Sequence, residues 1–442
     1  MLHAQIVEAL ETLCGDRLAD QVERLASHAF HGEVWDKAHH YFRQAGVQAM
    51  DRSANQEAAA CFEQALAALR HLPERRETME QAIDMRLDLY SALYPLIDFG
   101  HLLEYLHEAE RLAETLNDQG RLGWVSARIA HVFWTLGDYE RAIDTCHRAL
   151  TLATTLDDIR LESRLDMTTG YAHYALGNYH QARHFLEKNL AFLDAELMPS
   201  SPQRAWFMNA VFFQTWLVWC LTELGAFTEG IVCGEKAIRL MEALKQPYGI
   251  GHAYIGLGGG LLLQGELSQT IVLLERALAL SCEMNFPNVW MVSSAQLGYA
   301  YALSGRRREA LPLLEQAVEQ GMGIRGAGHA LWSVWLSETY LLADRIDDAL
   351  ALGQRTLEQA RTYKERGWEA YTLRLLGETA RHLTPQEISS AEMHYQQALT
   401  LANELGMRPL QAHCHRSLGT LYRQTRQAEQ ARAELIHQHR GR

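Results

Sequence analysis

Three short segments of the chain contain residue types that bind nucleotides or metals in other proteins. The segment 256–260 (GLGGG) has the composition of a dinucleotide-binding loop, but we expect it inside a helix with no strand before it. His107 and Glu108 begin like a zinc-protease motif, yet Arg111 stands where the second histidine is needed. Residues 413–415 (HCH) are adjacent, so their side chains point in different directions on a helix. We therefore predict no catalytic residue, no cofactor and no metal site.

Composition excludes further classes of function. No GxxxxGK[ST] loop is present to hold nucleotide phosphates. The chain has 442 residues and a net charge of −13, from 41 basic and 54 acidic residues, which argues against general nucleic-acid binding. The seven cysteines are scattered without a CxxC pair, as is typical of reduced thiols in a cytoplasm. There is no secretory signal and no apolar run long enough to cross a bilayer. We expect a cytoplasmic, non-catalytic protein that binds neither nucleic acid nor membrane.

The elements that position any binding residue follow from a repeated set of small residues. The set is complete at Gly298, Gly305, Ala310 and Ala317. Its second position recurs at residues 137, 177, 225, 265, 305 and 344, so most steps are close to forty residues. A fixed period of this size indicates a solenoid of helical hairpins. A solenoid presents an extended surface more often than a catalytic centre.

The spacing has a physical reason. Seven residues are about two helical turns, so the first two glycines of a set lie on one face of the first helix. The first glycine lets a neighbouring helix approach, and the second ends the helix in a left-handed conformation that costs glycine little. The alanine and the small residue that follow lie on one stripe of the second helix. They face the first helix at short range.

This pattern resembles the tetratricopeptide repeat, extended by several residues per unit. The segments 172–182 (AHYALGNYHQA) and 275–280 (ERALAL) match the core of that family, and the resemblance runs from about residue 31 to the end. It implies an all-α fold, a tetratricopeptide-like α-solenoid in which hairpins with a period of about 40 residues form a right-handed superhelix. We expect an N-terminal helical lead-in or cap at 1–30 and a repeat array of about ten hairpins at 31–442. A longer connection at 194–204 carries two prolines and two serines.

A narrower resemblance points to signalling. The segments 18–38, 63–73 and especially 404–422 (ELGMRPLQAHCHRSLGTLY) look like the C-terminal repeat region of large bacterial signalling proteins. In those proteins an adenylate or guanylate cyclase domain and a STAND-type or AAA-type ATPase precede the repeats. Neither domain is present in this sequence. Because residue 1 already begins an apolar-periodic helix, we expect a fragment or trimmed version of a longer protein, with an independent short gene as the alternative.

The first helix of each hairpin lines the concave side of such a solenoid, and the small residues fix its register. Residues at −6, −3, +1, +4 and +5 from each small position should face the groove. The predicted partner-binding residues are Trp124, His131, Trp134, Tyr171, Tyr174, Phe212, Trp219, Tyr299, Arg374, Arg381, Arg416 and Arg423. Others in the same register are Arg164, Met167, Glu223, His252, Glu338, Tyr371, Glu378 and His413. Aromatic residues prevail in the first half and arginines in the second, which suits an extended ligand with an apolar and an acidic stretch.

Other interpretations stay open at the level of sequence. The aromatic residues can instead pack the superhelix, and Trp216 is expected between hairpins. The asparagines and lysines that grip a C-terminal carboxylate in some tetratricopeptide domains are absent, since His131, Tyr171 and Trp219 occupy matching places. The segment 321–328 (GMGIRGAG) is a loose turn or a place where backbone meets a small ligand.

Three functions therefore remain. The leading hypothesis is a non-catalytic protein-interaction and regulatory module, the sensor or autoinhibitory arm of a bacterial cyclase or ATPase signalling protein. It would bind a peptide or protein segment in its concave groove and be linked to those domains in the full-length protein. The alternatives are a free-standing adaptor and a regulator that senses a small ligand or peptide.

Overall fold

The protein is built of helices throughout its described residues. The computed structural model describes residues 2–14, 18, 20–52, 54–96, 99–190, 204–322, 328–383 and 388–440. Every regular element in these ranges is helical and none is a strand, which confirms the all-α class. Most of the longer connection predicted at 194–204 and residues 323–327 of the glycine-rich segment lie outside the described residues.

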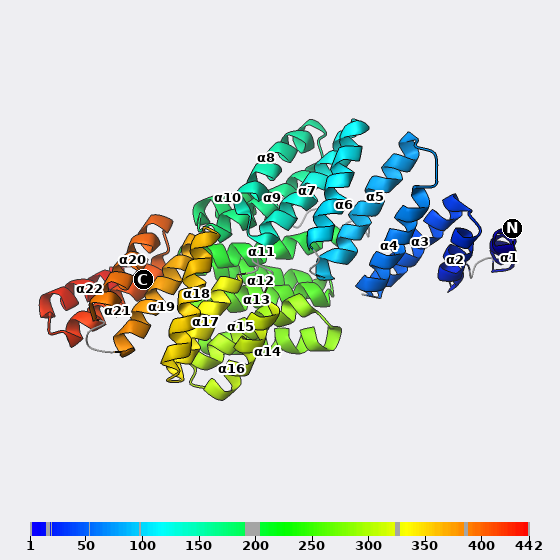
Figure 1. Ribbon diagram of the computed structural model, residues 1–442. Helices are drawn as coiled ribbons and strands as arrows, with labels where there is room; N and C mark the ends of the chain where they lie inside the picture. The colour runs from blue at the N-terminus through cyan, green and yellow to red at the C-terminus, as the bar shows by residue number, and fades with distance from the viewer. Residues whose placement is uncertain are drawn as a thin grey trace. The chain divides into compact units, whose positions relative to one another are not determined.

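In the described ranges, twenty-two α-helices follow one another (Figure 1), with the short 3₁₀ helix η2 between α5 and α6. Their bounds are α1 Leu2–Cys14, α2 Val22–His31, α3 Trp35–Asp51, α4 Asn55–Leu69, α5 Arg76–Leu93, η2 Tyr94–Leu96, α6 Phe99–Thr115, α7 Gln119–Leu136, α8 Tyr139–Thr155, α9 Ile159–Ala175, α10 Tyr179–Leu190, α11 Arg204–Glu223, α12 Phe227–Ala243, α13 Pro247–Gln264, α14 Leu267–Met284, α15 Pro287–Leu303, α16 Arg307–Gln320, α17 His329–Leu342, α18 Ile346–Thr362, α19 Arg366–Leu383, α20 Ile388–Leu405, α21 Arg408–Gln424 and α22 Ala428–Arg440.

The predicted repeat is present as a series of helical hairpins. Its recurring turn position has a left-handed backbone in six hairpins, a conformation that glycine adopts without steric cost. The φ angles are +86° at Gly137, +82° at Gly177, +75° at Gly225, +92° at Gly265, +81° at Gly305 and +60° at Asp344. The period of about forty residues is therefore confirmed as a structural repeat.

The small residues of each set allow the two helices of a hairpin to pack closely. A Cβ atom at Gly258 would lie 2.7 Å from a methyl carbon of Leu274, and one at Gly298 would lie 2.8 Å from Cγ of Leu314. Both distances are shorter than real Cβ contacts. Segment 256–260 lies inside α13, as expected, so Gly258 serves packing and not a nucleotide loop.

The chain divides into two compact units. Unit 1 comprises Met1–Phe133 and Arg141–Leu165, and unit 2 comprises Trp134–Glu140 and Asp166–Arg442. In unit 1, Val7 of α1, Leu25 of α2 and Tyr41 of α3 belong to one hydrophobic cluster. The expected lead-in therefore packs on the hairpin that follows it.

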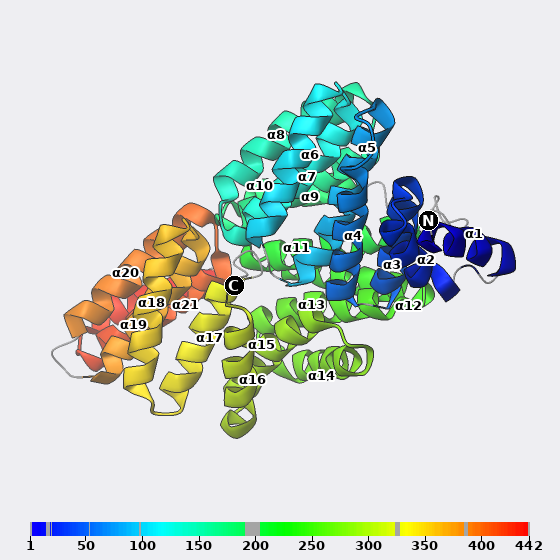
Figure 2. The ribbon, with the colours of Figure 1, turned by 45° about the vertical axis from the view of Figure 1, so that its right-hand side comes forward.

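Within unit 2, the first helices of successive hairpins lie side by side. Contacts join α11 to α13, α13 to α15, α15 to α17 and α17 to α19, while the second helices α12, α14, α16 and α18 pack between them. Figure 2 shows this succession in green and yellow. Proline stands in the first turn of α13 and α15, where the missing N–H costs no hydrogen bond.

The array in unit 2 also returns onto its own beginning. Tyr139 Oη donates a 2.5 Å hydrogen bond to Oε1 of Glu365, and Lys364 Nζ lies 2.7 Å from a carboxylate oxygen of Glu140. The hydroxyl group of Tyr179 packs so closely on Gly367 that a Cβ atom there would lie 2.1 Å from it. We call these turn-to-turn contacts, of Tyr139, Glu140 and Tyr179 with residues 364–367, the seam. Helix α11 likewise contacts α21.

Candidate functional site

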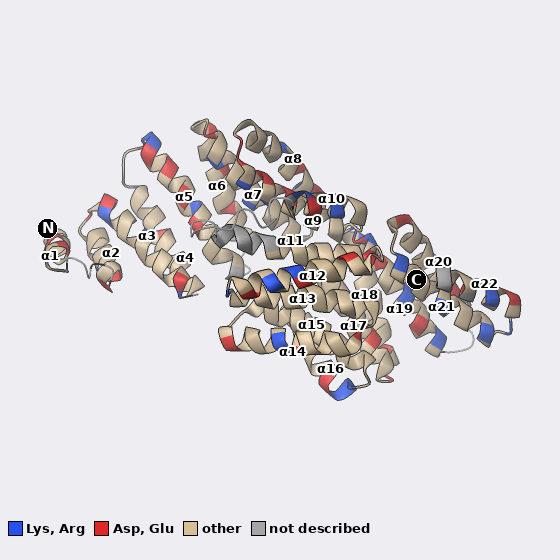
Figure 3. Ribbon diagram, turned by 180° about the vertical axis from the view of Figure 1, so that it is seen from behind, with Lys and Arg blue, Asp and Glu red and all other residues tan. Residues whose placement is uncertain are grey.

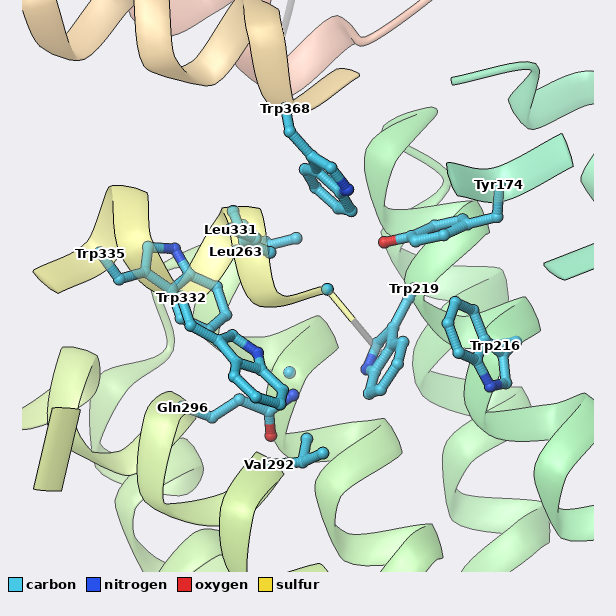
Figure 4. Close-up of a pocket in the computed structure, with 12 residues that line it drawn as sticks. Tyr174, Trp216, Trp219, Leu263, Val292, Gln296, Leu331, Trp332, Trp335 and Trp368 are labelled. Atoms are coloured by element: carbon cyan, nitrogen blue, oxygen red, sulfur yellow. The ribbon is translucent and has the colours of Figure 1, made fainter. Parts of the chain in front are cut away.

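A pocket lined by tryptophans lies at the centre of the array in unit 2. Its empty space is about 430 Å³, including the part that is open to solvent. Its wall is formed by residues of six first helices, α9, α11, α13, α15, α17 and α19, which surround the space (Figure 4). The lining residues are Tyr174, Trp216, Trp219, Gly259, Leu263, Val292, Gln296, Gly328, Leu331, Trp332, Trp335 and Trp368. Five of the ten tryptophans of the chain are among them.

The aromatic rings support one another around this pocket. Trp216 is central on one side, because its ring lies 4.5 Å from that of Tyr171, 5.2 Å from that of Tyr174 and 5.1 Å from that of Trp219. On the opposite side, Trp335 stacks on Tyr299 at 5.2 Å with an angle of 8° between the rings. Trp216 therefore packs among neighbouring helices, as expected, and also lines the pocket.

One glycine brings two polar side chains together at the pocket wall. A Cβ atom at Gly259 would lie 2.5 Å from Nε2 of Gln296 and 2.6 Å from Nε1 of Trp219. Both nitrogens therefore approach the same point over the α13 backbone, which only a glycine permits. Among the described residues, no group forms a hydrogen bond with Nε1 of Trp219 or with Oε1 of Gln296. Gln296 is 3% exposed, so these atoms are withdrawn from solvent as well.

A buried carboxyl group stands one helical turn beyond Trp219. Glu223 is fully buried and accepts a 2.8 Å hydrogen bond from the hydroxyl group of Tyr371. Burial raises the pKa of Glu223 to about 8, although the hydrogen bond from Tyr371 acts in the opposite direction. The carboxyl group is therefore largely protonated at neutral pH.

The C-terminal part of the inner wall is charged instead of aromatic. Arg374 Nη2 lies 3.1 Å from both carboxylate oxygens of Glu338, and Tyr299 Oη donates a 2.8 Å hydrogen bond to the same carboxylate. Arg381 donates a 2.9 Å hydrogen bond to Glu378. We call these five residues the ion-paired stripe.

The stripe sets the protonation of its own members. Burial alone would lower the pKa of Arg374, but the negative charge of Glu338 raises it above its ordinary value. Burial would raise the pKa of Glu378, yet the charge of Arg374 and a 2.6 Å hydrogen bond from Ser417 lower it. The arginines of the stripe are thus neutralised within the protein. Arg416 and Arg423 of α21 are exposed.

The remaining predicted residues have other surroundings. In unit 1, Trp124 Nε1 donates a 3.1 Å hydrogen bond to Asp158, and Nδ1 of the half-buried His131 lies 2.6 Å from the Tyr90 hydroxyl group. In unit 2, Trp134 is buried with its ring 5.3 Å from that of Tyr171. Phe212 contacts the ring of His252 edge to face at 4.6 Å. Of the twelve predicted residues, the pocket itself brings together Tyr174 and Trp219.

The sequence register does not include the other tryptophans of the pocket, for a definite reason. The five-position register omits the flanking helix positions that hold Gln296, Trp332, Trp335 and Trp368, which complete the wall only because several helices surround one centre. A usable signal is the presence of two or more tryptophans in the first helices α11 and α17. Gly259 could be read only as packing, because the side chains over it come from α11 and α15.

The described residues contain no arrangement typical of metal binding or of a membrane span. No group of three or more histidine, cysteine or acidic side chains among them could hold a metal ion. Within the HCH segment, Cys414 is buried and His415 contacts Glu434 at 2.5 Å. No helix in the described ranges is both long and apolar enough to cross a bilayer. Helices such as α12 and α16 carry both basic and acidic residues (Figure 3).

Comparison with known proteins supports the repeat family. Residues 126–155 match the model of the tetratricopeptide repeat. The fold is a tetratricopeptide-like α-solenoid. It is similar to a Rap protein complexed with competence and sporulation factor, at 13% identity and a TM-score of 0.57 over 84% of this chain and 99% of that one. No curated protein matches the sequence.

Two further solved structures are similar to the same extent. NprR in complex with its cognate peptide NprX has 13% identity and a TM-score of 0.55, over 82% of this chain and 98% of that one. The Rap conjugation gene regulator of plasmid pLS20, in complex with the Phr* peptide, has 13% identity and a TM-score of 0.52, over 82% and 94%. At this identity the likeness concerns the fold.

Proposed function

We propose that this chain is a non-catalytic interaction module that binds a peptide or protein segment along the inner wall of unit 2. The observation that carries the proposal is the pocket of five tryptophans, whose buried polar atoms on Trp219 and Gln296 lack partners among the described residues. Buried polar groups are paired in most proteins, so an unpaired set in a pocket suits a ligand. Tryptophan is also enriched among the residues that dominate binding energy.

Two of the similar folds were solved with peptides, the NprX peptide and the Phr* peptide, which supports a peptide as the ligand class. The finer parts of the proposal rest on the sequence. The resemblance of segment 404–422 to cyclase-linked repeats favours a regulatory arm of a bacterial signalling protein over a free-standing adaptor. The net charge of −13 argues against nucleic acid, and the scattered cysteines favour a cytoplasmic location.

A small-molecule ligand is the second candidate. The observation in its favour is the apolar, tryptophan-rich lining with a single amide, which is the usual composition of a small-molecule site. A regulator of this kind would show a saturable thermal shift with a metabolite.

To test the proposal, a displayed library of random peptides is selected for binding to the full chain. Selected peptides are then measured against Trp219→Ala and a matched control, Trp290→Ala, which truncates another half-buried tryptophan outside the pocket. We expect Trp219→Ala to weaken binding at least about 30-fold, as at an interface hot spot, and the control to leave it unchanged. A library without binders, or equal binding by both variants, would contradict the proposal.

The link to a signalling enzyme has its own test. An immunoblot of the native cells with an antibody to this chain should show a band well above 50.2 kDa. A band at 50.2 kDa would favour the free-standing adaptor.

A further inference from the structure

Helices α7 and α9 of unit 1 contain two arginines whose positive charges act on each other. We propose that Arg128 and Arg164 together bind one carboxylate group of a ligand, which an acidic side chain or the free C-terminus of a peptide supplies. Both arginines belong to unit 1, whereas the proposed function rests on the inner wall of unit 2. The carboxylate site is therefore a further one, and it does not depend on the tryptophan pocket.

The repeat places these side chains near one another. Buried residues of α7 and α9 belong to one hydrophobic cluster, and Trp124 packs against it. Arg128 and His131 follow Trp124 by four and seven residues, so the three side chains lie on one face of α7. Arg164 occupies the position in α9 that Trp124 occupies in α7, one repeat earlier. The register that predicts groove residues from the sequence thus includes Trp124, His131 and Arg164.

Two aromatic rings hold the guanidinium group of Arg128 in place. Its Cζ atom lies 4.8 Å from the ring centre of Tyr90 and 5.9 Å from that of Trp124. The face of an aromatic ring attracts a cation, but it does not accept hydrogen bonds as a carboxylate does. A guanidinium group has several N–H donors in a fixed plane. The rings therefore orient Arg128 and leave it able to donate hydrogen bonds to a ligand.

Among the described residues, no carboxylate forms an ion pair with Arg128. Burial and the positive charge of Arg164 lower the pKa of Arg128, and only the hydroxyl group of Tyr90 acts in the opposite direction. Burial and the charges of the two arginines also hold the pKa of His131 well below its ordinary value, so this imidazole adds no further charge at neutral pH. By contrast, each arginine of the ion-paired stripe lies beside a carboxylate.

A carboxylate group matches such a pair of arginines. It has two oxygens, one for each guanidinium group, and the charge-assisted hydrogen bonds between these partners are stronger than neutral ones. Its negative charge also offsets the repulsion between Arg128 and Arg164. Because the chain as a whole has a net charge of −13, a local pair of mutually repelling arginines is an exception that suits a functional site.

The test is isothermal titration calorimetry of the full chain with the capped pentapeptide acetyl-AAEAA-amide. The matched peptide acetyl-AAQAA-amide has the same shape without the charge, and acetyl-AAQAA with a free C-terminus moves the negative charge to the end of the peptide. We expect the glutamate peptide to bind with a Kd of about a millimolar at low ionic strength, and the neutral peptide to bind at least about tenfold more weakly. Added salt should weaken binding, since screening reduces the attraction.

Substitution of the arginines shows whether they bind the peptide. Arg128→Met and Arg164→Met should each weaken the glutamate peptide at least about tenfold and leave the neutral peptide unchanged, because only a charged partner is lost. Arg148→Met removes an exposed arginine of α8 in the same unit and should change neither. Arg128→Lys keeps the charge but not the planar group, so it should weaken the glutamate peptide only about threefold. If Arg128→Met does not fold, Arg128→Lys and Arg164→Met still decide the matter.

A measurement without peptide separates binding from a purely structural role. Arg128→Met should keep or raise the midpoint of thermal unfolding, because it removes the repulsion with Arg164. If Arg128 only supported the fold through Tyr90 and Trp124, its substitution would lower that midpoint and leave the affinity for the glutamate peptide unchanged.

The outcomes are distinct from those that test the proposed function. Equal binding of the glutamate peptide and the neutral capped peptide by the wild type would overturn the inference, and so would full affinity for the glutamate peptide in both Arg128→Met and Arg164→Met. Tighter binding of the peptide with a free C-terminus would support the site and identify the terminus as the source of the carboxylate. A peptide library without binders would contradict the proposed function and leave the carboxylate site standing.

Discussion

Two glutamates on the inner wall of unit 2 show how differently its two regions are built. Glu223 lies one helical turn beyond Trp219 of the aromatic pocket, and burial raises the pKa of its carboxyl group to about 8, with no opposing cation among the described residues. Glu378 lies in the charged part of the wall, where the charge of Arg374 and the hydrogen bond from Ser417 outweigh burial and lower its pKa. The same residue type is therefore largely neutral in one region and ionised in the other.

The comparison shows which region has polar groups that can still form new interactions with a ligand. In the ion-paired stripe, each charge is already matched by another protein group, so a ligand gains little by approaching it. At the pocket, the buried polar atoms of Trp219 and Gln296 have no partner among the described residues. Replacing a polar side chain by an apolar one should therefore lower the free energy of unfolding in the stripe. The same kind of replacement at the pocket should leave the free energy of unfolding almost unchanged.

The largest expected effect is the pH dependence that Glu223 confers. The folded protein binds the proton more tightly than the unfolded chain, since the pKa rises from 4.5 to about 8. Stability from this group is thus complete below about pH 4.5 and is lost as the pH rises through about 8, a loss of roughly 3–5 kcal/mol. Denaturant unfolding between pH 5 and 9 should show this decline for the wild type and not for Glu223→Gln. An exposed counterpart, Glu283→Gln, should keep the decline.

Arg374→Met should produce the next largest change. Removing the guanidinium group leaves Glu338 and Glu378 without their shared counter-charge in a largely buried place. We expect a loss of about 3 kcal/mol in the free energy of unfolding at pH 7. Arg239→Met, which removes an exposed ion pair with Glu235, should change stability by less than about 0.5 kcal/mol. Equal effects of the two variants would contradict the description of the stripe.

Tyr299→Phe gives an intermediate effect within the same stripe. It deletes a 2.8 Å hydrogen bond to the Glu338 carboxylate and keeps the ring that stacks on Trp335. A loss of about 1.5 kcal/mol is expected from urea unfolding, because the acceptor is charged. The control is Tyr254→Phe, whose hydroxyl group lies 3.3 Å from Glu242 at an exposed site. If Tyr254→Phe lowered the free energy of unfolding more than Tyr299→Phe does, the contrast between the buried stripe and the exposed surface would be wrong.

The smallest expected effect is at the pocket. Gln296→Leu replaces a buried amide, whose oxygen has no partner among the described residues, by an apolar group of similar size, so stability should stay the same or rise by up to about 1 kcal/mol. Thermal and urea unfolding of the variant without ligand would measure it. A loss of 2 kcal/mol or more would mean that the amide is already satisfied by the protein.

The local architecture could be predicted from the sequence because it follows from short-range sterics. The turn glycines, such as Gly177 and Gly305, have the expected left-handed φ, and Gly298 packs on Leu314 as the spacing requires. Each of these relations lies within a single hairpin. The same register gives residues of the inner wall, including Tyr174 and Trp219.

The closure of the array could not be predicted in the same way. Whether Tyr139 meets Glu365 depends on a small rotation between neighbouring hairpins, accumulated over several repeats. A period in the sequence does not encode the size of that rotation. The pocket depends on the closure as well, since Tyr174 and Trp368 face the same space only when α9 and α19 come together. The pairing of Arg374 with Glu338 does not depend on the closure, because both residues are at predicted groove positions on the adjacent helices α19 and α17.

The seam gives unit 2 a property that open solenoids lack. In an open array each repeat touches only its neighbours, so the ends can fray independently and folding can propagate from any point. Tyr139 and Glu365 are 226 positions apart, and closing so long a loop costs entropy that adjacent hairpins do not incur. Once closed, the hairpins that meet at the seam protect each other from local opening. Unit 2 should therefore unfold as one cooperative body, and deleting its last hairpins should expose amide hydrogens to exchange in the first.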